Sequence, residues 1–246
     1  MTRLALVTGA SRGLGAAIAL TLARAGWNVA INYAHDDESA DAVRQAVVAQ
    51  GGFAVLAKFD VTQPVEVTAA IARLVETAGP VDLIVNNATG PQGAASIMDQ
   101  TWDLYARHLD YFVKAPLLLL QAVLPDWRRR GTGRVINIGS DAVDVGSPFD
   151  GHYVAAKAAQ VGMTRSWASE LGPDGITVNL VSPGWTPVER HASTDRKELG
   201  KYRSQVPLRR MGRPEDVAEL VAFVASKKAD YVTGHNFAVN GGRTYR

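Results

Sequence analysis

Tyr153 and Lys157 stand four residues apart in a segment of helical periodicity, so both side chains project from one face of the helix. A free tyrosine has a pKa of about 10 and is a poor base at neutral pH, but a nearby ammonium favours the phenolate and lowers that pKa. Tyr153 can then give a proton to a carbonyl oxygen or take one from an alcohol. Ser140 ends a predicted strand, and its hydroxyl can hydrogen-bond the same oxygen. Without further support, Tyr and Lys at this spacing are ordinarily just neighbours on a helix surface.

Other reactive side chains offer no competing site. The chain contains no Cys, which excludes disulfides, thiolate catalysis and Cys-ligated metals. The histidines His108, His152, His191 and His235 are scattered without metal-ligand spacing, so we expect no metal centre. The Gly-x-Ser-x-Gly pattern of an acyl nucleophile is absent around Ser140.

A glycine-rich turn follows the first predicted strand, with the sequence Thr8-Gly9-Ala10-Ser11-Arg12-Gly13-Leu14-Gly15. Glycine tolerates the left-handed turn and the close backbone approach that a pyrophosphate requires. The helix that follows offers unpaired N–H groups and the positive end of its dipole. Any tight strand-to-helix turn can use glycines, but the position of this one in a βαβ unit near the N-terminus favours nucleotide binding.

Strands and helices alternate along the whole chain. Strand patterns cover residues 4–8, 27–33, 53–58, 82–85, 134–138, 176–181 and 236–239, and helical patterns cover 13–25, 37–50, 64–77, 101–130, 153–171 and 215–225. The strands are nearly unbroken apolar runs, which is typical of parallel strands covered on both faces. We therefore predict one α/β domain over residues 1–246, with a doubly wound, mainly parallel sheet of about seven strands. Residues 186–207 have little pattern and many charges, and we expect them to form a mobile substrate loop.

Composition fits a globular protein without a polyanionic partner. Of 246 residues, 47% are hydrophobic and 20% are charged. The net charge of only +2 does not indicate a basic surface for binding nucleic acid. No signal-peptide pattern precedes the first strand, and the longest apolar segment, residues 115–124, is too short to span a bilayer. We expect a cytoplasmic protein with no membrane partner.

Several motifs in this order resemble the short-chain dehydrogenase/reductase family over the whole chain. They are Thr-Gly-x-x-x-Gly-x-Gly at 8–15, Asp60-Val61, Asn86-Asn87-Ala88, Ser140 with Tyr153-x-x-x-Lys157, Ser182-Pro183-Gly184, Gly212-Arg213-Pro214-Glu215-Asp216-Val217-Ala218, Val232-Thr233-Gly234 and Asn240-Gly241-Gly242. Within the family, the chain looks most similar to 3-oxoacyl-acyl-carrier-protein reductases. The resemblance implies a Rossmann-type fold, a nicotinamide cofactor that supplies the hydride, and catalysis by Ser140, Tyr153 and Lys157.

The second predicted strand indicates which nicotinamide cofactor is preferred. Tyr33 stands where an NAD-preferring enzyme has a carboxylate for the ribose 2′-hydroxyl, whereas Asp36 and Asp37 are expected to begin the next helix. Arg12 resembles the family arginine that pairs with a 2′-phosphate, a group that a guanidinium fork suits. We predict NADP(H) over NAD(H). The expected cofactor contacts are Gly9, Ser11, Arg12, Gly13, Leu14, Gly15, Tyr33, Asp60, Val61, Asn87, Ala88, Tyr153, Lys157, Pro183, Gly184 and Thr186.

Two positions depart from the family pattern. The family carries a fourth catalytic residue, an Asn that helps to hold a proton-relaying water near the lysine, and this chain has Phe112 there. Either backbone carbonyls hold the water, or the relay is slower, or the activity differs. Thr89 stands where Gly is common; it either narrows the pocket near the nicotinamide or packs against the following loop.

The leading hypothesis is an NADP(H)-dependent oxidoreductase that reduces a carbonyl to an alcohol, or the reverse, on a small or carrier-linked substrate. A cofactor-sensing or scaffolding protein with a degenerate site is one alternative, and a non-redox dehydratase or epimerase is another. The resemblance also implies a homotetramer with the helices around 101–130 and 153–171 at one interface. Trp185 and the charged residues of the predicted loop are candidate pocket residues: Glu189, Arg190, His191, Arg196, Lys197, Glu198 and Lys201.

Overall fold

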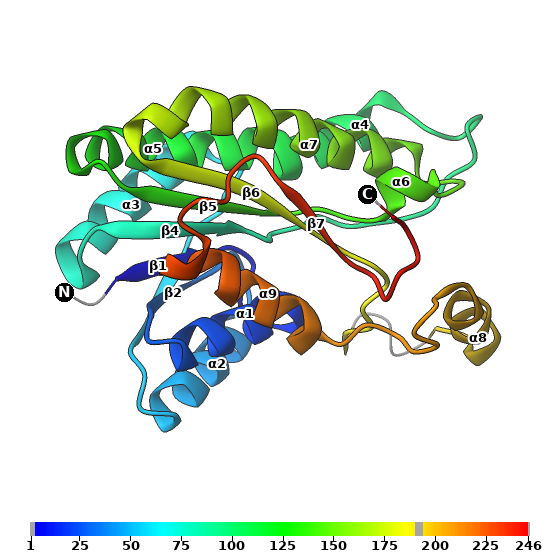
Figure 1. Ribbon diagram of the computed structural model, residues 1–246, viewed down its shortest axis with the longest axis horizontal. Helices are drawn as coiled ribbons and strands as arrows, with labels where there is room; N and C mark the ends of the chain where they lie inside the picture. Colours follow the sequence, from blue (N-terminus) through cyan, green and yellow to red (C-terminus); the bar gives the residue numbers. More distant parts are fainter. Residues whose placement is uncertain (1–2, 190–193, 246) are drawn as a thin grey trace.

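Seven parallel strands form one sheet in the order β3-β2-β1-β4-β5-β6-β7 in the computed structural model, which describes residues 3–189 and 194–245 (Figure 1). Every neighbouring pair of strands is parallel. The strands are β1 (Leu4–Val7), β2 (Asn28–Tyr33), β3 (Ala54–Lys58), β4 (Val81–Asn86), β5 (Gly133–Ile138), β6 (Ile176–Pro183) and β7 (Asn236–Val239). The predicted fold class and strands are confirmed.

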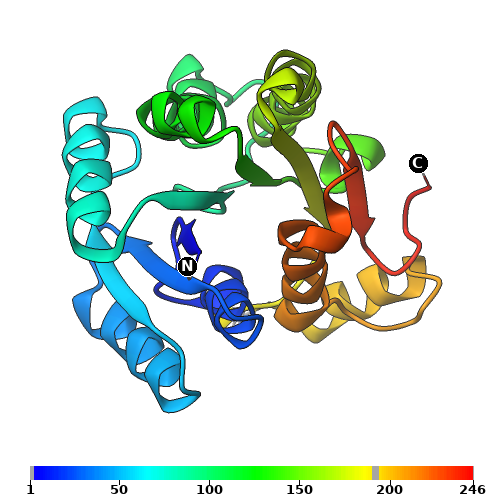
Figure 2. The same cartoon turned by 60° about the vertical axis from the view of Figure 1, so that its left-hand side comes forward.

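Helices cover both faces of the sheet (Figure 2). One layer consists of α1 (Gly13–Arg24), α2 (Asp37–Ala49) and α9 (Pro214–Ala225). The other consists of α3 (Pro64–Ala78), α4 (Trp102–Leu109), α5 (Ala115–Arg130) and α7 (Gly151–Leu171). Shorter helices are α6 (Ala142–Val145), α8 (Arg196–Gln205) and the 3-10 turns η2 (Gly172–Asp174) and η4 (Lys227–Ala229). No helix in the described part of the chain is both long and apolar enough to cross a membrane.

Strands β1 to β6 each contribute to two hydrophobic cores because successive side chains point to opposite faces. In β1, Ala5 and Val7 pack with α1 and α9, whereas Leu4 and Leu6 pack with α3 and α5. All four are at most 1% exposed. Burial on both faces explains why the strand sequences are unbroken apolar runs.

The strand order reverses between β1 and β4, where consecutive connections run to opposite sides of the sheet. In doubly wound sheets, ligands bind in the crevice at the carboxyl ends of the strands at such a switch point. The glycine-rich turn leaves β1 at this point, and Asn87 leaves β4 there. The fold therefore brings the predicted nucleotide-binding motifs to the position where this architecture has its crevice.

The predicted helix over 101–130 is not continuous, which corrects the sequence interpretation. Between α4 and α5 lies one π-helical turn, η1 (Asp110–Lys114), in which the amide of Ala115 donates to Asp110 O. Pro116 explains the break: it has no N–H to donate to the Phe112 carbonyl, and its ring crowds that carbonyl. The wider turn relieves this conflict and places Phe112 on the side facing α7.

The predicted substrate loop over 186–207 is also not all loop, because α8 occupies Arg196–Gln205. Asp195 caps this helix by accepting a hydrogen bond from the Lys197 amide at 2.9 Å. Tyr202 is the one buried residue of α8, so this segment lacks the apolar residues at helical spacing from which a helix is predicted. Arg190 and His191 lie outside the described residues.

Candidate active site

Backbone and amide hydrogen bonds lock the glycine-rich turn to β4. The Thr8 hydroxyl accepts from the amides of Asn87 and Ala88 at 2.8 and 2.9 Å. The Asn87 side chain donates to Thr8 O and Gly9 O at 2.8 and 3.1 Å. The predicted cofactor residues of the first and fourth strands therefore form one rigid unit at the switch point.

The turn has the shape that a dinucleotide phosphate requires. Gly9 and Gly13 have φ values of 61° and 56°, in the left-handed region that favours glycine. A Cβ on Gly15 would lie 2.2 Å from Gly9 O and 2.6 Å from Asn87 Nδ2, so only glycine fits there. No side chain caps α1 at Arg12, which leaves its first N–H groups for an anion. Ser11 and Leu14 are half-buried within this turn.

The segment leaving β6 closes over the turn. Pro183 ends β6, and Gly184 and Thr186 follow it, with the Thr186 hydroxyl donating to Gly184 O at 3.1 Å. A Cβ on Gly13 would lie 3.3 Å from Glu189 Oε2 and 3.4 Å from the Val188 Cβ. The end of this loop, at Val188 and Glu189, therefore lies against the glycine-rich turn, whereas Gly184 faces Tyr202 and Asn240.

Tyr33 and its neighbours form a polar group at the end of β2. The Tyr33 hydroxyl donates to Asp37 at 2.8 Å, and burial together with this carboxylate raises the pKa of Tyr33 to about 12. Lys58 pairs with Asp37 at 2.6 Å, and Lys58 and Tyr33 hold the pKa of this carboxyl below its usual value. Asp36 caps α2 through the Ser39 amide, as predicted.

Asn32 is a positioning residue that the sequence analysis missed. It is 2% exposed, accepts from the Gly9 amide at 3.2 Å and donates to Ala57 O and Phe59 O at 3.2 and 3.0 Å. It thus ties the turn after β1 to the end of β3, where Asp60 and buried Val61 follow. A lone amide within an apolar strand was the available signal.

Ser140, Tyr153 and Lys157 come together at the carboxyl end of β5. Ser140 follows β5 by two residues, and its Oγ accepts from the Ala142 amide at 3.1 Å. Lys157, only 5% exposed, donates to Ile138 O at 2.6 Å, and its Nζ lies 5.8 Å from the centroid of the Tyr153 ring. This arrangement supplies a hydroxyl donor and a phenol beside a buried ammonium, which suits proton exchange with a carbonyl or alcohol oxygen.

Aromatic and imidazole rings surround the tyrosine. His108 stacks on His152 with ring centroids 4.7 Å apart, and its edge meets Tyr153 at 5.9 Å. His108 Nδ1 lies 2.8 Å from Leu104 O. Because a carbonyl oxygen can only accept a hydrogen bond, Nδ1 carries the proton and donates it to Leu104 O. Burial lowers the pKa of His108. Among the described residues, no group of three or more His, Asp or Glu side chains could hold a metal ion.

Thr89 is exposed, and its hydroxyl belongs to its own loop. It donates to Gly90 O at 3.3 Å and accepts from the Gln92 side chain at 3.0 Å. These contacts match the interpretation in which Thr89 packs against the following loop.

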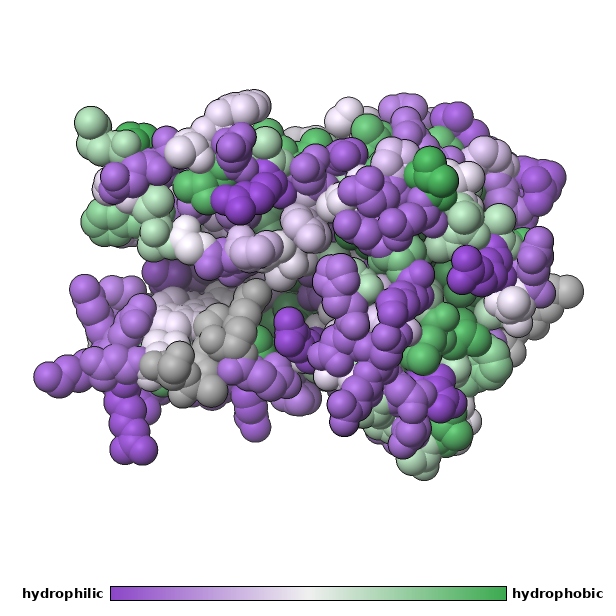
Figure 3. Space-filling view, turned by 180° about the vertical axis from the view of Figure 1, so that it is seen from behind, coloured by the Kyte–Doolittle hydropathy of each residue, from purple (hydrophilic) through white to green (hydrophobic). Residues whose placement is uncertain are grey.

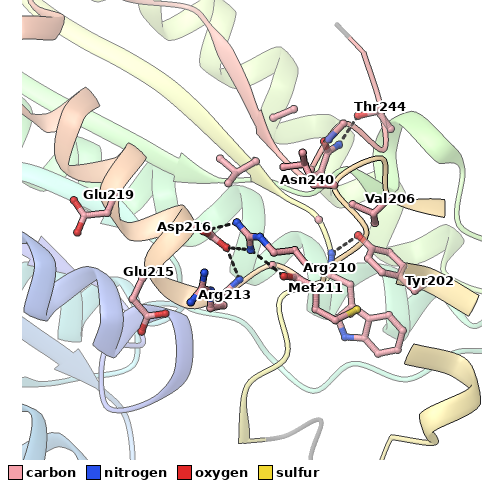
Figure 4. Close-up of a pocket in the computed structure, with 18 residues that line it drawn as sticks. Tyr202, Val206, Arg210, Met211, Arg213, Glu215, Asp216, Glu219, Asn240 and Thr244 are labelled. Atoms are coloured by element: carbon pink, nitrogen blue, oxygen red, sulfur yellow. Dashed lines mark hydrogen bonds and ion pairs between the residues drawn. The ribbon is translucent and has the colours of Figure 1, made fainter. Parts of the chain in front are cut away.

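A separate cavity of about 840 Å³ lies behind the Gly184–Trp185 loop, between α8, the start of α9 and the segment after β7 (Figure 4). Arg210 reaches Asp216 at 2.9 Å on one side, while Tyr202 and Asn240 lie toward the chain end that carries Thr244. Ser140, Tyr153 and Lys157 are not among its lining residues. Trp185 lines this cavity and packs edge-to-face on Tyr202 with centroids 5.3 Å apart.

Known proteins are similar to this chain in sequence and in fold. A family model described as Enoyl-(Acyl carrier protein) reductase matches residues 9–244. The 3-oxoacyl-[acyl-carrier-protein] reductase FabG of Staphylococcus aureus is 40% identical over 244 residues, covering 98% of each chain. The chain belongs to the short-chain dehydrogenase/reductase family. It is accordingly an oxidoreductase.

Further relatives act on different carbonyl or alcohol compounds, according to their names. The acetoacetyl-CoA reductase of Rhizobium meliloti is 37% identical over 246 residues and covers all of both chains. A crystal structure of acetoin dehydrogenase YohF from Salmonella typhimurium matches with a TM-score of 0.88 and 32% identity, covering 99% of this chain and 97% of that one. A putative gluconate dehydrogenase from Agrobacterium tumefaciens matches with a TM-score of 0.93 and 30% identity, covering 98% and 95%.

Proposed function

We propose that the protein is an NADP(H)-dependent ketoreductase that reduces the 3-oxo group of an acyl thioester, on a carrier or on coenzyme A, to the alcohol. The carrying observation is that Lys157, buried beside the Tyr153 ring, donates to Ile138 O at the end of β5, two residues before Ser140. The neighbouring strand β4 leads directly into Asn87, which is hydrogen-bonded to the glycine-rich turn. The names of the relatives that are 37–40% identical support this substrate class. The bound cofactor supplies the hydride that makes the new C–H bond.

The residues of the chain have distinct tasks in this reaction. The Ser140 and Tyr153 hydroxyls hydrogen-bond the carbonyl oxygen and fix its position. Tyr153 gives its proton to that oxygen as the alcohol forms, and the Lys157 ammonium stabilises the phenolate that remains. Lys157 is held for this task by Ile138 O and by Gln160 Oε1 at 3.2 Å.

The rim of the crevice fits a substrate with an apolar arm. Seen from behind, the molecule is notched at the end that carries α8, and apolar side chains gather on the rim opposite that helix (Figure 3). Ile97 and Met98 precede α4, Trp102 begins α4 and Phe149 precedes α7, and these four side chains are 60–89% exposed. The opposite rim is hydrophilic because α8 carries Arg196, Lys197, Lys201 and Arg203 against Glu198. An acyl chain favours the first rim, and the polar carrier portion favours the second.

NADP(H) is the proposed cofactor because exposed Arg12 projects from the turn and the nearby carboxylates are already engaged. Asp36 caps α2, and Asp37 is bonded by Tyr33 and Lys58. A homotetramer, with α5 and α7 at one interface, remains a prediction that light scattering tests.

The test is to mix the protein with NADPH and acetoacetyl-CoA and follow nicotinamide absorbance. We expect absorbance loss that matches the 3-hydroxyacyl product mole for mole. Tyr153→Phe should lower kcat by a factor of about 100 or more while still binding NADPH. Cofactor binding with no turnover on any acyl thioester would favour the sensing alternative instead.

A further inference from the structure

The face of the Phe112 ring lies directly against the Lys157 ammonium. Lys157 Nζ is 3.7 Å from the ring centroid, well within the range of about 6 Å at which a cation is attracted to an aromatic face. Both residues are buried, with 2% and 5% of their surface exposed. The contact is therefore largely shielded from water, where such attraction is strongest.

The surroundings hold this geometry from several sides. The edge of the Phe112 ring meets Tyr153 at a centroid distance of 5.6 Å and an interplanar angle of 83°, and His108 packs on it at 5.8 Å. The π-helical turn that Pro116 requires presents the ring to α7. The position of Phe112 is thus set by the backbone and by two neighbouring rings.

We propose that Phe112 is a positioning residue that seats the Lys157 ammonium on its ring face and favours the charged form of the lysine. A buried ammonium loses hydration, which by itself disfavours the charge. The ring face, Ile138 O and Gln160 Oε1 together replace that hydration. Phe112 thereby supplies through its quadrupole what a hydrogen-bonding side chain would supply through a dipole.

The described titratable groups near Lys157 come from α7, α4 and the π-helical turn. Tyr153 and His152 lie on its own helix, and His108 lies on α4. On the π-helical turn, Asp110 and Lys114 pair with each other at 3.6 Å, and both are 44–47% exposed. The Ile138 carbonyl and the Phe112 ring, which both contact Lys157, do not titrate. Replacing the ring therefore measures the effect of the ring alone on the titration of Lys157.

The first experiment uses cofactor-free protein with lysines labelled by ¹³C at Cε, and Lys157→Arg to assign the signal. In the wild type, we expect an upfield shift of the Lys157 ε-methylene from the ring current of Phe112, and this shift should vanish in Phe112→Leu. The titration midpoint of Lys157 should fall by about one pH unit in Phe112→Leu. Pentafluorophenylalanine at position 112 keeps the ring shape but reverses its quadrupole, and it should lower the midpoint similarly.

The fluorinated protein keeps the test decisive if Phe112→Leu does not fold. An unchanged Lys157 midpoint with pentafluorophenylalanine, in a protein of native circular dichroism, would overturn the proposal. An absent upfield shift in the wild type would overturn it equally.

The second experiment rests on the proposed reductase function. If Lys157 must be charged during reduction, then a lower midpoint moves the fall of kcat at high pH toward lower pH. We expect this displacement in Phe112→Leu, with kcat reduced about 10-fold. The two proposals fail separately. A shifted Lys157 midpoint in the Phe112 variants without any carbonyl reduction by the wild type would refute only the reductase function. Carbonyl reduction with an unshifted Lys157 midpoint would refute only the proposed role of Phe112.

Discussion

The Arg243 guanidinium carbon lies 4.5 Å from the centroid of the Tyr202 ring. Arg243 also pairs with both carboxylate oxygens of Asp141 at 3.3 Å, and Asp141 directly follows Ser140. The Tyr202 hydroxyl accepts from the Trp185 amide. One cation near the C-terminus therefore joins α8, the loop after β6 and the segment that carries the predicted catalytic serine.

The first prediction concerns this cation. Asp141 is 3% exposed, and removing its ionic partner leaves a buried charge with weaker compensation. Arg243→Ala should lower the free energy of unfolding by about 2 kcal/mol, measured by urea denaturation. Arg73→Ala, on the exposed face of α3, is the control and should change it by less than about 0.5 kcal/mol.

The same variant should respond to pH in a defined direction. Burial raises the pKa of Asp141, and Arg243 opposes this rise. Because the folded state then holds the proton more tightly than the unfolded state, stability falls as pH rises through this range. Arg243→Ala raises the pKa of Asp141 in the folded state further. The loss of unfolding free energy in this variant, relative to the wild type, should therefore be larger near pH 8 than near pH 4. An equal deficit at both values would contradict the ionic explanation.

The second prediction tests the glycine-rich turn. A Cβ at position 15 would collide with Gly9 O, which is backbone and cannot yield freely. Gly15→Ala should cost about 2–3 kcal/mol of stability and abolish measurable NADPH binding in a fluorescence titration. Gly162, exposed in α7 with nothing within 4 Å of an added Cβ, is the control. Gly162→Ala should raise the free energy of unfolding by about 0.5–1 kcal/mol, because alanine has a higher helix propensity than glycine.

The third prediction separates the two nicotinamide cofactors. Arg12→Gln should weaken NADPH binding by a factor of about 10–100, since it loses charge-assisted hydrogen bonds, and leave NADH binding nearly unchanged. The NADPH affinity of Arg12→Lys should lie between those of the wild type and Arg12→Gln, because lysine keeps the positive charge but lacks the paired N–H donors of the guanidinium. Dissociation constants from indole-to-nicotinamide energy transfer measure this. Equal losses for both cofactors would assign Arg12 to the shared diphosphate.

Those parts of the molecule that depend on burial were predictable from sequence. Strands β1, β2, β4, β5 and β6 were visible because they are covered on both faces and are mainly apolar. The edge strands β3 and β7 are less buried and were recognised by their short apolar runs. The helix α8 was not, because its only buried side chain is Tyr202. The π-helical turn was missed although Pro116 stands in the interior of the predicted helix over 101–130, because the helical pattern continues on both sides of this proline.

The same division holds within the site. Local spacing identified Tyr153 and Lys157, since an i, i+4 pair shares a face in any helix. Contacts between distant segments were out of reach, and these include Asn32 with β3 and Arg243 with Asp141. The sequence showed Phe112 as a departure from the family, but only the fold reveals that its ring faces Lys157.

The last prediction concerns acid sensitivity. His108 is 4% exposed, and its Nε2 has no hydrogen-bond partner among the described residues. Burial lowers the pKa of His108 from its ordinary value of 6.5, so the unfolded state binds the proton more readily than the folded state. Stability contributed by this residue is therefore present above about pH 6.5 and is lost as pH falls below it.

His108→Phe keeps a ring between His152 and Phe112 but cannot take up a proton. The variant should lose less unfolding free energy than the wild type between about pH 8 and about pH 5, measured by urea denaturation at each pH. His235→Phe, which alters an exposed histidine, is the control and should follow the wild type. If His108→Phe is as acid-sensitive as the wild type, then the buried imidazole is not a source of that sensitivity.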